Sequence, residues 1–359
     1  MLNRVLIMAG GTGGHVFPAL AVAQALKEKG VEVTWLGTRN GLEANVVPNA
    51  GFEIDWIKIH GLRGNGFAGW LLAPLKLLFA GLQAASVIKK RKPDIVIGMG
   101  GFVTGPGGFM AWLLRKPVLI HEQNAIPGLT NRLLANLSVR VLEAFPGAFG
   151  HAINAIAIGN PVRAALMSLP APAERFTGRD EKKLRVLVVG GSLGARAINL
   201  VMPEVINTLG DEVLDVWHQT GKKLFEETQA VYKKRNVTAR VSPFIDDMAE
   251  AYAWADVVVC RAGALTISEL AAVGVGSILV PFPHAVDDHQ TKNAQYLVDV
   301  GAATLVSQND LSAERLARDL SELLKNRLQA LTMAEAAYSV RQIDSVNQVL
   351  IYCDEVANV

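Results

Sequence analysis

Cysteine is nearly absent from this chain of 359 residues. Its two cysteines, Cys260 and Cys353, cannot build a disulfide framework, so a reducing cytoplasm is the expected compartment. The first residues also lack the long apolar region and the small-residue cleavage site of a secretory signal, and they lead directly into a short strand pattern. Both absences predict a cytoplasmic rather than a secreted protein.

Several ligand motifs are missing as well. No Gly-Lys-(Ser/Thr) sequence follows a glycine-rich loop, which excludes a Walker A site. A dinucleotide fingerprint starting at Gly11 would place Val16 where a third glycine belongs, and the strand expected at 31–37 ends without a ribose-binding acid, so a nicotinamide cofactor is disfavoured. No cluster has strong metal-ligand spacing, since His284 and His289 lie five residues apart with acids between them. Neither a cofactor nor a metal is therefore expected.

The chain does contain two similar glycine-rich loops, about half its length apart. An apolar run leads into Gly-Gly-Thr-Gly-Gly-His at 10–15, and a second apolar run leads into Gly-Gly-Ser-Leu-Gly at 190–194. Glycine lets backbone approach a ligand closely, and the N-terminus of a following helix offers free N–H groups and a partial positive charge. Two such loops indicate two nucleotide-binding folds, although tight turns alone would also explain the glycines.

Charge is distributed unevenly along the chain. The net charge is only +2, yet residues 1–163 carry 16 Lys and Arg against 8 Asp and Glu, and the remainder carries 19 against 25. A basic first half suits an anionic lipid or a phosphate, and scattered surface charges would give the same count. Because the basic residues are not interleaved with aromatic residues, no nucleic-acid partner is expected.

Short β-branched runs alternate with helical patterns throughout, which is typical of parallel sheets built from βαβ units. The expected strands are 3–9, 31–37, 53–59, 94–98, 117–121 and 139–143 in the first half, and 185–190, 213–218, 237–242, 256–260, 277–282 and 302–306 in the second. The Pro-rich and charged stretch 170–183 is the best linker candidate. A last helical pattern has no strand after it and could cross back onto the first domain.

An apolar segment at 67–82 precedes the basic run Lys89–Lys92. Pro74 and Lys76 within it, and its place in a βαβ crossover, argue against a spanning helix. A buried crossover helix remains an alternative. The basic run favours a helix with one face at an anionic membrane surface, made by Trp70, Leu71, Leu75 and Phe79 with Lys89–Lys92.

Ligands of open α/β sheets bind beyond the carboxyl ends of strands. A third glycine-rich loop, 98–106, and the polar run His121–Asn124 both follow expected strands. His15 begins the first helix, where the positive helix end favours a neutral imidazole that can accept a proton, and a capping role is equally compatible. Glu122 is the alternative base, provided that the fold buries it partly.

The second half has two comparable candidates. Residues 260–269 follow a strand and open a helix, so that Glu269 lies about one turn beyond a glycine turn and can accept two ribose hydroxyls. The polar run 287–293 opens the next helix, where an N-cap role for Asp288 does not explain Gln290 or Asn293.

Four of these motifs, together with the run Gly159–Arg163, resemble those of the bacterial MurG family in the same order: Gly10–His15, His121–Asn124, Gly159–Arg163, Gly190–Ser192 and Arg261–Glu269. The similarity covers essentially the whole chain, and five ordered motifs are far more specific than one glycine-rich loop. The family transfers N-acetylglucosamine from UDP to the membrane intermediate lipid I, making lipid II for peptidoglycan.

The resemblance implies an α/β protein of the GT-B class, with two Rossmann-like, doubly wound parallel-sheet domains facing a central cleft. It implies an acceptor and membrane-facing domain at 1–163, joined by a C-terminal helix at about 341–359, and a UDP-sugar domain at 164–340. It further implies inversion at the anomeric carbon, no metal, and a peripheral location on the cytoplasmic face of the bacterial inner membrane. Partners among other cell-wall synthesis or division proteins stay open.

The resemblance also implies roles for individual residues. The catalytic candidates are His15 and Glu122. The residues implied for UDP-N-acetylglucosamine are Thr12, Gly13, Gly14, Asn124, Arg163, Ser192, Ile245, Ala264, Leu265, Thr266, Ile267, Ser268, Glu269 and Gln290. Those implied for the acceptor pyrophosphate are Gly10, Gly11, Gly100, Gly101 and Thr104. The family often has paired glutamines at the last donor site, whereas His289 precedes Gln290 here.

Two other functions are compatible with the same patterns. A UDP-sugar 2-epimerase would also need two domains and a UDP site, but no lipid surface. A membrane-bound scaffold would bind the nucleotide sugar without turnover.

Overall fold

The computed structural model describes residues 2–59, 72–179, 182–191 and 194–357. Contacts within the chain divide it into two compact units. The first unit comprises Met1–Val162 together with Asp344–Val359, and the second comprises Arg163–Ile343. The chain therefore leaves the first unit and returns to it at its end.

A parallel sheet of seven strands forms the centre of the first unit, in the order β3-β2-β1-β4-β5-β6-β7. Its strands are β1 (Arg4–Met8), β2 (Glu32–Gly37), β3 (Glu53–Trp56), β4 (Ile95–Gly98), β5 (Val118–Glu122), β6 (Arg140–Glu143) and β7 (Ile156–Ala157). The order reverses between β1 and β4, which pair in parallel from Val5 with Ile95 to Met8 with Gly98. Such a reversal is where open α/β sheets bind ligands.

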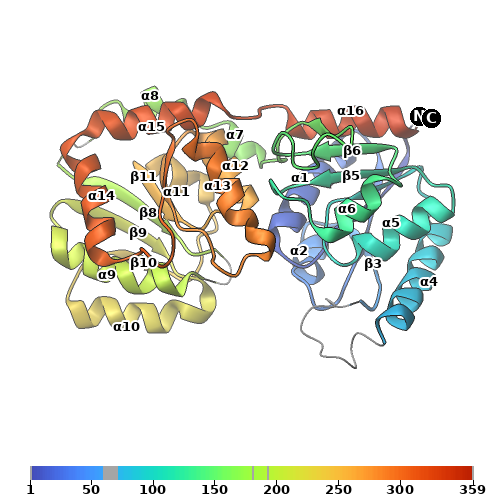
Figure 1. Ribbon diagram of the computed structural model, residues 1–359, viewed down its shortest axis with the longest axis horizontal. Helices are drawn as coiled ribbons and strands as arrows, with labels where there is room; N and C mark the ends of the chain where they lie inside the picture. The colour runs from blue at the N-terminus through green and yellow to red at the C-terminus, as the bar shows by residue number, and fades with distance from the viewer. Residues whose placement is uncertain (1, 60–71, 180–181, 192–193, 358–359) are drawn as a thin grey trace. The chain divides into compact units, whose positions relative to one another are not determined.

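Helices cover both faces of this sheet (Figure 1). They are α1 (Gly13–Glu28), α2 (Glu43–Asn49), α4 (Ala73–Arg91), α5 (Thr104–Leu113), α6 (Leu129–Ala135) and α16 (Ser345–Ala357). Alternate residues of β1 point to opposite faces: Val5 and Ile7 pack with α1 and α16, whereas Leu6 and Met8 pack with α4, α5 and α6. Because both faces are covered, the strands are apolar almost throughout.

The second unit repeats the plan with six parallel strands in the order β10-β9-β8-β11-β12-β13. They are β8 (Leu184–Val189), β9 (Leu214–Gln219), β10 (Arg240–Ser242), β11 (Val257–Cys260), β12 (Gly276–Leu279) and β13 (Ala303–Leu305). Its α-helices are α7 (Ala164–Met167), α8 (Pro172–Phe176), α9 (Arg196–Leu209), α10 (Phe225–Arg235), α11 (Met248–Trp254), α12 (Ala264–Val273), α13 (His289–Val298), α14 (Ala313–Lys325) and α15 (Arg327–Ser339). The order reverses between β8 and β11, so both units have a switch point of the same kind.

These sheets confirm the predicted fold class of two Rossmann-like parallel-sheet domains. Every expected strand overlaps an observed one, and only the two-residue strand β7 was not expected. Ile156–Ala157 is too short to produce a period-two pattern, so its sequence carries no strand signal.

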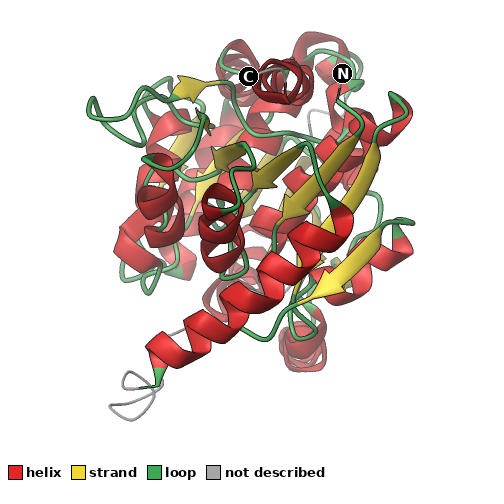
Figure 2. Cartoon of the chain, turned by 90° about the vertical axis from the view of Figure 1, so that its right-hand side faces the viewer, coloured by secondary structure: helices red, strands yellow, loops and turns green. Residues whose placement is uncertain are grey.

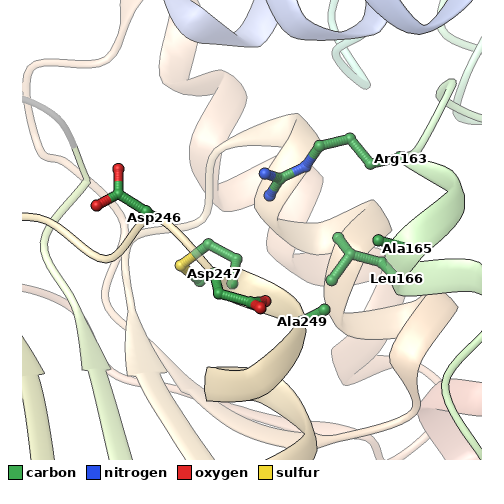
Figure 3. Close-up of a pocket in the computed structure, with 7 residues that line it drawn as sticks. Arg163, Ala165, Leu166, Asp246, Asp247 and Ala249 are labelled. Carbon is green, nitrogen blue, oxygen red and sulfur yellow. The ribbon is translucent and has the colours of Figure 1, made fainter.

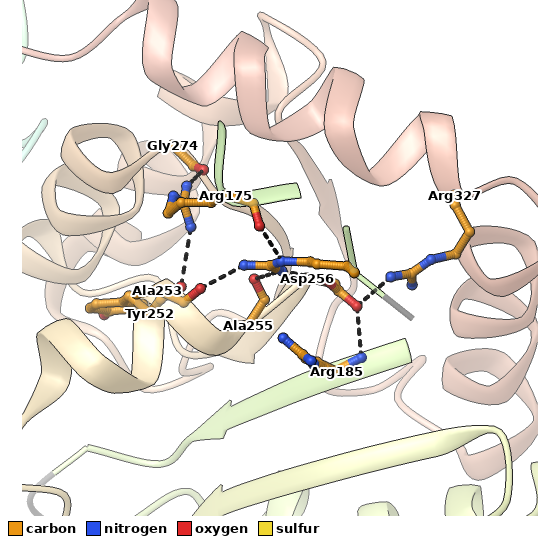
Figure 4. A network of polar contacts seen from close by, with 9 residues as sticks. Arg175, Arg185, Tyr252, Ala253, Ala255, Asp256, Gly274 and Arg327 are labelled. Atoms are coloured by element: carbon orange, nitrogen blue, oxygen red, sulfur yellow. Dashed lines mark hydrogen bonds and ion pairs between the residues drawn. The ribbon is translucent and has the colours of Figure 1, made fainter. Parts of the chain in front are cut away.

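The linker expected at 170–183 is instead packed on the second unit as far as the structure describes it. Arg175 of α8 donates to the carbonyls of Val273 (2.7 Å) and Gly274, and Arg179 donates to that of Ala253 (2.6 Å). Figure 4 shows this network extending to the buried carboxylate of Asp256, which also accepts from Arg179, Arg327 (2.5 Å) and the Arg185 backbone N–H (2.9 Å). Proline and charge suggested a linker here because the sequence does not show these long-range partners.

Helix α4 is half buried and half exposed. Figure 2 shows its N-terminal end projecting from the first unit, and Pro74 occupies its first turn, where proline is compatible with a helix. Ala80, Ala84 and Ile88 pack in the core, whereas Leu78 and Phe79 are 59% and 61% exposed. Within the described residues, no helix is both long and apolar enough to cross a membrane.

Candidate functional site

The first switch point is built by two glycine-rich loops that follow β1 and β4. The Gly10 N–H donates to the Gly100 carbonyl (3.3 Å), and the Met99 N–H donates to the Met8 carbonyl (2.8 Å). A Cβ on Gly101 would lie 2.2 Å from the Gly10 carbonyl oxygen, and Gly101 has a φ of +89°. Glycine is therefore required at Gly101, because only glycine allows both this conformation and this approach.

Hydrogen bonds within the protein already engage the first two N–H groups of the β1 loop. Besides the Gly10 bond, the Gly11 N–H donates to Oε2 of the buried Glu43 (2.9 Å), whose Oε1 accepts from the Thr38 N–H and hydroxyl (2.9 and 2.7 Å). These bonds do not support Gly10 and Gly11 as N–H donors to a phosphate, and the Glu43 carboxylate would repel an anion there.

The start of α1 offers the anion-binding groups instead. Its N-cap, Thr12, makes no side-chain capping bond, and no acceptor among the described residues meets the N–H groups of Gly13 or Gly14. Unsatisfied N–H groups at a helix N-terminus attract an anion.

Thr104, expected at the acceptor pyrophosphate, is fully buried. Its hydroxyl lies 3.1 Å from the Met8 carbonyl and 2.9 Å from the Gly100 carbonyl, so its hydrogen is shared between two backbone oxygens. These contacts give Thr104 a role in holding the β4 loop against β1.

A chain of polar side chains connects His15 to the end of β5. Nδ1 of the half-buried His15 lies 2.8 Å from Oε1 of Gln123, and Nε2 of Gln123 lies 3.0 Å from Nδ1 of His121. Nε2 of His121 lies 2.9 Å from the Gly159 carbonyl oxygen. The next residue, Asn160, donates from Nδ2 to the Gln123 carbonyl (3.0 Å), so the motif at 159–163 supports the motif at 121–124.

Glu122 is buried, and four donors meet its carboxylate. Oε1 accepts from the Asn124 N–H and Nδ2 (2.9 and 3.1 Å), and Oε2 accepts from the Gly128 N–H and Asn131 Nδ2 (3.1 and 2.9 Å). A carboxylate has about four lone-pair sites. The carboxylate of Glu122 therefore fixes the conformation of the loop after β5, which includes Asn124.

At the second switch point, Glu269 of α12 is buried beside two partners. Arg163 donates from one guanidinium nitrogen to Oε1, and the Tyr252 hydroxyl donates to Oε2, both at 3.1 Å. Burial raises the pKa of the Glu269 carboxyl, against the opposing effect of Arg163 and Tyr252. A half-exposed guanidinium beside a desolvated carboxylate provides one group for phosphate oxygens and one for hydroxyls.

The helix that carries Glu269 begins without a capping side chain. Its N-cap is Gly263, and no described residue accepts from the N–H groups of Leu265 or Thr266. Ile267 is buried, and the Ser268 hydroxyl donates to the Ala264 carbonyl (3.1 Å) within the helix. The free N–H groups at the start of α12 are therefore suited to hold a phosphate.

A pocket of about 360 Å³ lies next to Arg163, the partner of Glu269. Figure 3 shows Arg163 extending toward the pocket, which is lined by Arg163, Ala165, Leu166, Asp246, Asp247, Met248 and Ala249. Ile245 immediately precedes the lining residues, is buried, and makes no backbone hydrogen bond within the described chain.

Other expected donor residues lie around the same sheet edge. Gln290 of α13 accepts from the Phe282 N–H through Oε1 (2.9 Å), which leaves its amide hydrogens pointing elsewhere. Asn293 donates to the Ala262 carbonyl (3.3 Å), and Arg261 is held by the carbonyls of Val280 and Pro281 (3.1 Å each). Ser192 lies outside the described residues. Within those residues, no group of three potential ligands is placed to hold a metal ion.

Sequence reasoning missed Gln123, Tyr252 and Glu43 as site residues. Gln123 was noticed only as part of a polar run, and the run does not reveal that its amide connects two histidines. Tyr252 and Glu43 contact the site from other elements, so no local spacing identifies them.

Family models match both halves of the chain. The glycosyltransferase family 28 N-terminal domain matches residues 5–142, and the family 28 C-terminal domain matches residues 185–349. Together they cover most of the chain.

Individual proteins match over nearly the full length. A protein of Marinobacter nauticus named UDP-N-acetylglucosamine--N-acetylmuramyl-(pentapeptide) pyrophosphoryl-undecaprenol N-acetylglucosamine transferase is 54% identical over 357 residues, 99% of this chain and 98% of its own. The crystal structure of Acinetobacter baumannii MurG has a TM-score of 0.84 and 41% identity, over 98% of this chain and 99% of that one. A putative UDP-N-acetylglucosamine 2-epimerase of Listeria monocytogenes has a TM-score of 0.67 at 14% identity, over 98% and 95% of the two chains, and shares the fold alone.

Proposed function

Because the chain belongs to glycosyltransferase family 28, and within it to the MurG family, we propose that it transfers N-acetylglucosamine from UDP-N-acetylglucosamine to lipid I. The product is lipid II, the disaccharide intermediate of peptidoglycan synthesis. The observation that carries this proposal is the 54% identity to the Marinobacter nauticus transferase over 99% of this chain. The 2-epimerase is only 14% identical to this chain, so its sequence gives no support for an epimerase function here.

The reaction is a displacement at the anomeric carbon of the donor sugar. The oxygen of the 4-hydroxyl of the N-acetylmuramoyl residue attacks that carbon, and the bond from the carbon to the UDP oxygen breaks. UDP leaves with the electron pair, the acceptor hydroxyl loses its proton to a base, and the configuration inverts. The protein must therefore supply a proton acceptor and stabilise negative charge on the leaving diphosphate.

His15 fits the proton acceptor better than Glu122 does. A general base must be able to reach the proton that it removes. Both oxygens of the Glu122 carboxylate are already bonded to donors that fold the surrounding loop. His15 is half-buried and bonds through Nδ1, and no described residue bonds to its Nε2.

The second unit holds the UDP moiety in this proposal. The free N–H groups at the start of α12 bind phosphate, Arg163 neutralises part of the diphosphate charge, and Glu269 accepts hydrogen bonds from the ribose hydroxyls. The backbone of Ile245 pairs with uracil beside the pocket, and the amide hydrogens of Gln290 donate to the sugar. Ser192 remains a proposed diphosphate ligand on the resemblance alone.

In the first unit, the N–H groups of Gly13 and Gly14 are the proposed anion site. Gly100 and Gly101 belong to the neighbouring loop and shape it, as do Gly10, Gly11 and Thr104 through the bonds described above. The acceptor pyrophosphate and the donor sugar are the two ligands with oxygens suited to these groups.

We propose that the first unit attaches peripherally to the cytoplasmic face of the bacterial inner membrane. Leu75, Leu78, Phe79 and Leu82 form one exposed stripe on α4 at helical spacing. The neighbouring helices α5 and α6 add exposed side chains, namely Phe109, Trp112, Leu113, Leu129 and Leu133. Exposed apolar side chains gathered on neighbouring helices are typical of an interaction site. Lipid I carries a polyprenyl chain that stays in the bilayer, so the enzyme must come to the membrane surface.

Two of the four residues of the basic run are engaged in ion pairs, and the run lies at the other end of the helix from the exposed apolar stripe. Lys90 and Arg91 pair with Asp55 at 3.0 and 2.6 Å, and Arg91 also pairs with Glu53 at 2.6 Å. At 1.5 Å per residue, Lys89 lies about 15 Å along the helix from Phe79. Trp70 and Leu71 lie outside the described residues. Lys76 and Arg115 are exposed and adjoin the apolar residues in sequence, so they are better placed for anionic headgroups.

Vesicle sedimentation tests the membrane proposal. Replacing Leu78 and Phe79 together with serine should lower binding to anionic vesicles at least tenfold, because each apolar side chain contributes about 1.5–3 kcal/mol when buried. The matched control, Leu328→Ser, removes an exposed leucine from the second unit and should bind normally. Wild-type-like binding by the double variant would contradict the proposal.

An assay with labelled UDP-N-acetylglucosamine and a short-chain, water-soluble lipid I analogue tests the reaction. The expected result is labelled disaccharide product and one UDP released for each sugar transferred. Epimerised sugar without acceptor would support the epimerase, and nucleotide binding without UDP release would support the scaffold.

A further inference from the structure

We propose that Gln123 and His121 are positioning residues that hold His15 with a hydrogen on Nδ1, so that the lone pair of its neutral tautomer lies on Nε2. Nε2 of His15 is then the nitrogen that accepts the proton of the acceptor hydroxyl. The catalytic part rests on the proposed function, whereas the assignment of the hydrogen is a property of the chain by itself.

The argument starts at the Gly159 carbonyl, which can only accept a hydrogen bond. Nε2 of His121 lies 2.9 Å from this oxygen and must carry the hydrogen between them. His121 is fully buried, and this burial lowers its pKa to about 4, so the ring is neutral near pH 7. A neutral ring with its hydrogen on Nε2 has a lone pair on Nδ1.

The orientation of the Gln123 amide follows from His121. The amide nitrogen of Gln123 lies 3.0 Å from the His121 Nδ1 lone pair and 3.1 Å from the His121 carbonyl oxygen. Both are acceptors, so the NH₂ group must face them. If the amide were turned over, its oxygen would face two acceptors, and both hydrogen bonds would be lost at a buried position, which is unfavourable.

The amide oxygen of Gln123 therefore faces His15. It lies 2.8 Å from Nδ1 of His15 and can only accept, so Nδ1 carries the hydrogen. The neutral His15 ring then has its lone pair on Nε2, for which no described residue supplies a hydrogen-bond partner. The Gly159 carbonyl thus determines the tautomer of His121, which determines the orientation of the Gln123 amide and, through it, the hydrogen on His15.

Gly100 keeps the His15 ring in this position. A Cβ at Gly100 would lie 2.6 Å from Nδ1 of His15, and Gly100 has a φ of +97°. Any side chain there would collide with the ring and displace it. The glycine-rich loop after β4 thus shapes the site of the base, in addition to its contact with the β1 loop.

The hydrogen can be located directly by ¹⁵N NMR of protein labelled at histidine, with His15→Gln used to assign the signals. We expect His15 to show a protonated Nδ1 and an unprotonated Nε2 above neutral pH. A hydrogen on Nε2 would overturn the proposal. The tautomer itself is read from the wild-type protein, and the variant serves only to identify the His15 signals.

The variant Gln123→Leu keeps a similar volume and removes both hydrogen bonds of the amide. The His15 signals should become those of a mixture of tautomers, and kcat should fall roughly ten- to a hundredfold, as for other groups that orient a functional histidine. KM for both substrates should stay within about twofold, since no substrate group is removed. Gln123→Glu keeps an acceptor for Nδ1 of His15 and should retain more of kcat than the leucine variant.

Gln24→Leu is the matched control, because Gln24 lies on the same helix as His15 but is exposed and pairs with Glu28. It should leave the His15 signals and kcat unchanged. A Gln123→Leu protein with wild-type signals and kcat would contradict the positioning role. A wild-type protein with the expected hydrogen on Nδ1 but no transfer to lipid I would contradict the proposed function and leave the tautomer assignment intact.

Discussion

The glycine-rich loops of the two units are held in the same way, yet their surroundings differ. In the first unit, the second glycine of the loop, Gly11, donates to the carboxylate of Glu43 at 2.9 Å. In the second unit, the second glycine, Gly191, donates to the amide oxygen of Gln219 at 3.2 Å. In both, a side chain of the same unit takes the N–H group that a simple motif reading would assign to a phosphate.

The difference lies in the polar groups next to the switch points. The first unit has three polar side chains in series, those of His15, Gln123 and His121, which suit the handling of a proton. The second unit has a charged pair, Arg163 and Glu269, beside the free end of α12, which suits the binding of a diphosphate and hydroxyls. One sheet topology thus supports two kinds of chemistry, because side chains at the strand ends decide the function.

The largest expected effect comes from His15 in the first unit. His15→Ala should lower kcat by roughly 10²–10⁴ and leave KM for the donor nearly unchanged, because a base acts in the transition state. Steady-state kinetics measures both. Glu122→Gln is the comparison: it replaces one acceptor oxygen with an NH₂ group that faces N–H donors, so it should mainly lower the free energy of unfolding. If the Glu122 variant alone is inactive while folded, and the His15 variant is active, the roles are reversed.

The second prediction is that acid lowers the stability of both units, because each contains a buried histidine. Burial lowers the pKa of His121 to about 4 and that of His218 to about 3, from 6.5. Between pH 6.5 and the lowered pKa of each histidine, the unfolded chain binds more protons than the folded one. The free energy of unfolding should therefore fall as the pH falls from 6.5 toward 4. The loss should be about 3 kcal/mol for His121 alone.

Urea unfolding followed by circular dichroism at several pH values measures this loss. His218→Phe should be less stable than the wild type at pH 8, since Tyr232 and Asn199 lose their partner, but less sensitive to acid. An unfolding free energy that does not change between pH 7 and 5 would contradict the prediction for both histidines.

The charged pair of the second unit should control donor binding. Glu269→Ala should raise KM for UDP-N-acetylglucosamine well over tenfold, because each lost charge-assisted hydrogen bond is worth about 1.5–3 kcal/mol. Glu250→Ala, on the exposed surface of α11, is the control and should bind the donor normally. A folded Glu269 variant with unchanged KM would remove this residue from the donor site.

The smallest expected effect belongs to Tyr252→Phe. The change removes the hydrogen bond from the Tyr252 hydroxyl to the Glu269 carboxylate and leaves the bond from Arg163 in place, so KM for the donor should rise only about two- to tenfold. Titration calorimetry with UDP separates this effect on binding from any effect on turnover. A loss of kcat with unchanged affinity would show that Tyr252 serves another step.

The strands and the paired glycine-rich loops could be predicted because their signals are local. Runs of β-branched residues identified the strands, and alternating elements identified parallel sheets. The contacts of Gly11 with Glu43, 32 residues away, and of Arg175 with Gly274, 99 residues away, have no local signal. The same reason explains why 170–183 resembled a linker and why the apolar faces of α5 and α6 were not joined to that of α4.

The position of α16 has a consequence for how the protein is made. Val349, Leu350, Cys353 and Val356 complete the core of the first unit, but about 180 residues of the second unit precede them. At about 5–20 residues per second, the ribosome needs roughly 10–35 s to synthesise that stretch. Throughout this time one face of the nascent first sheet lacks its last covering helix, so the first unit to emerge is the last to be finished.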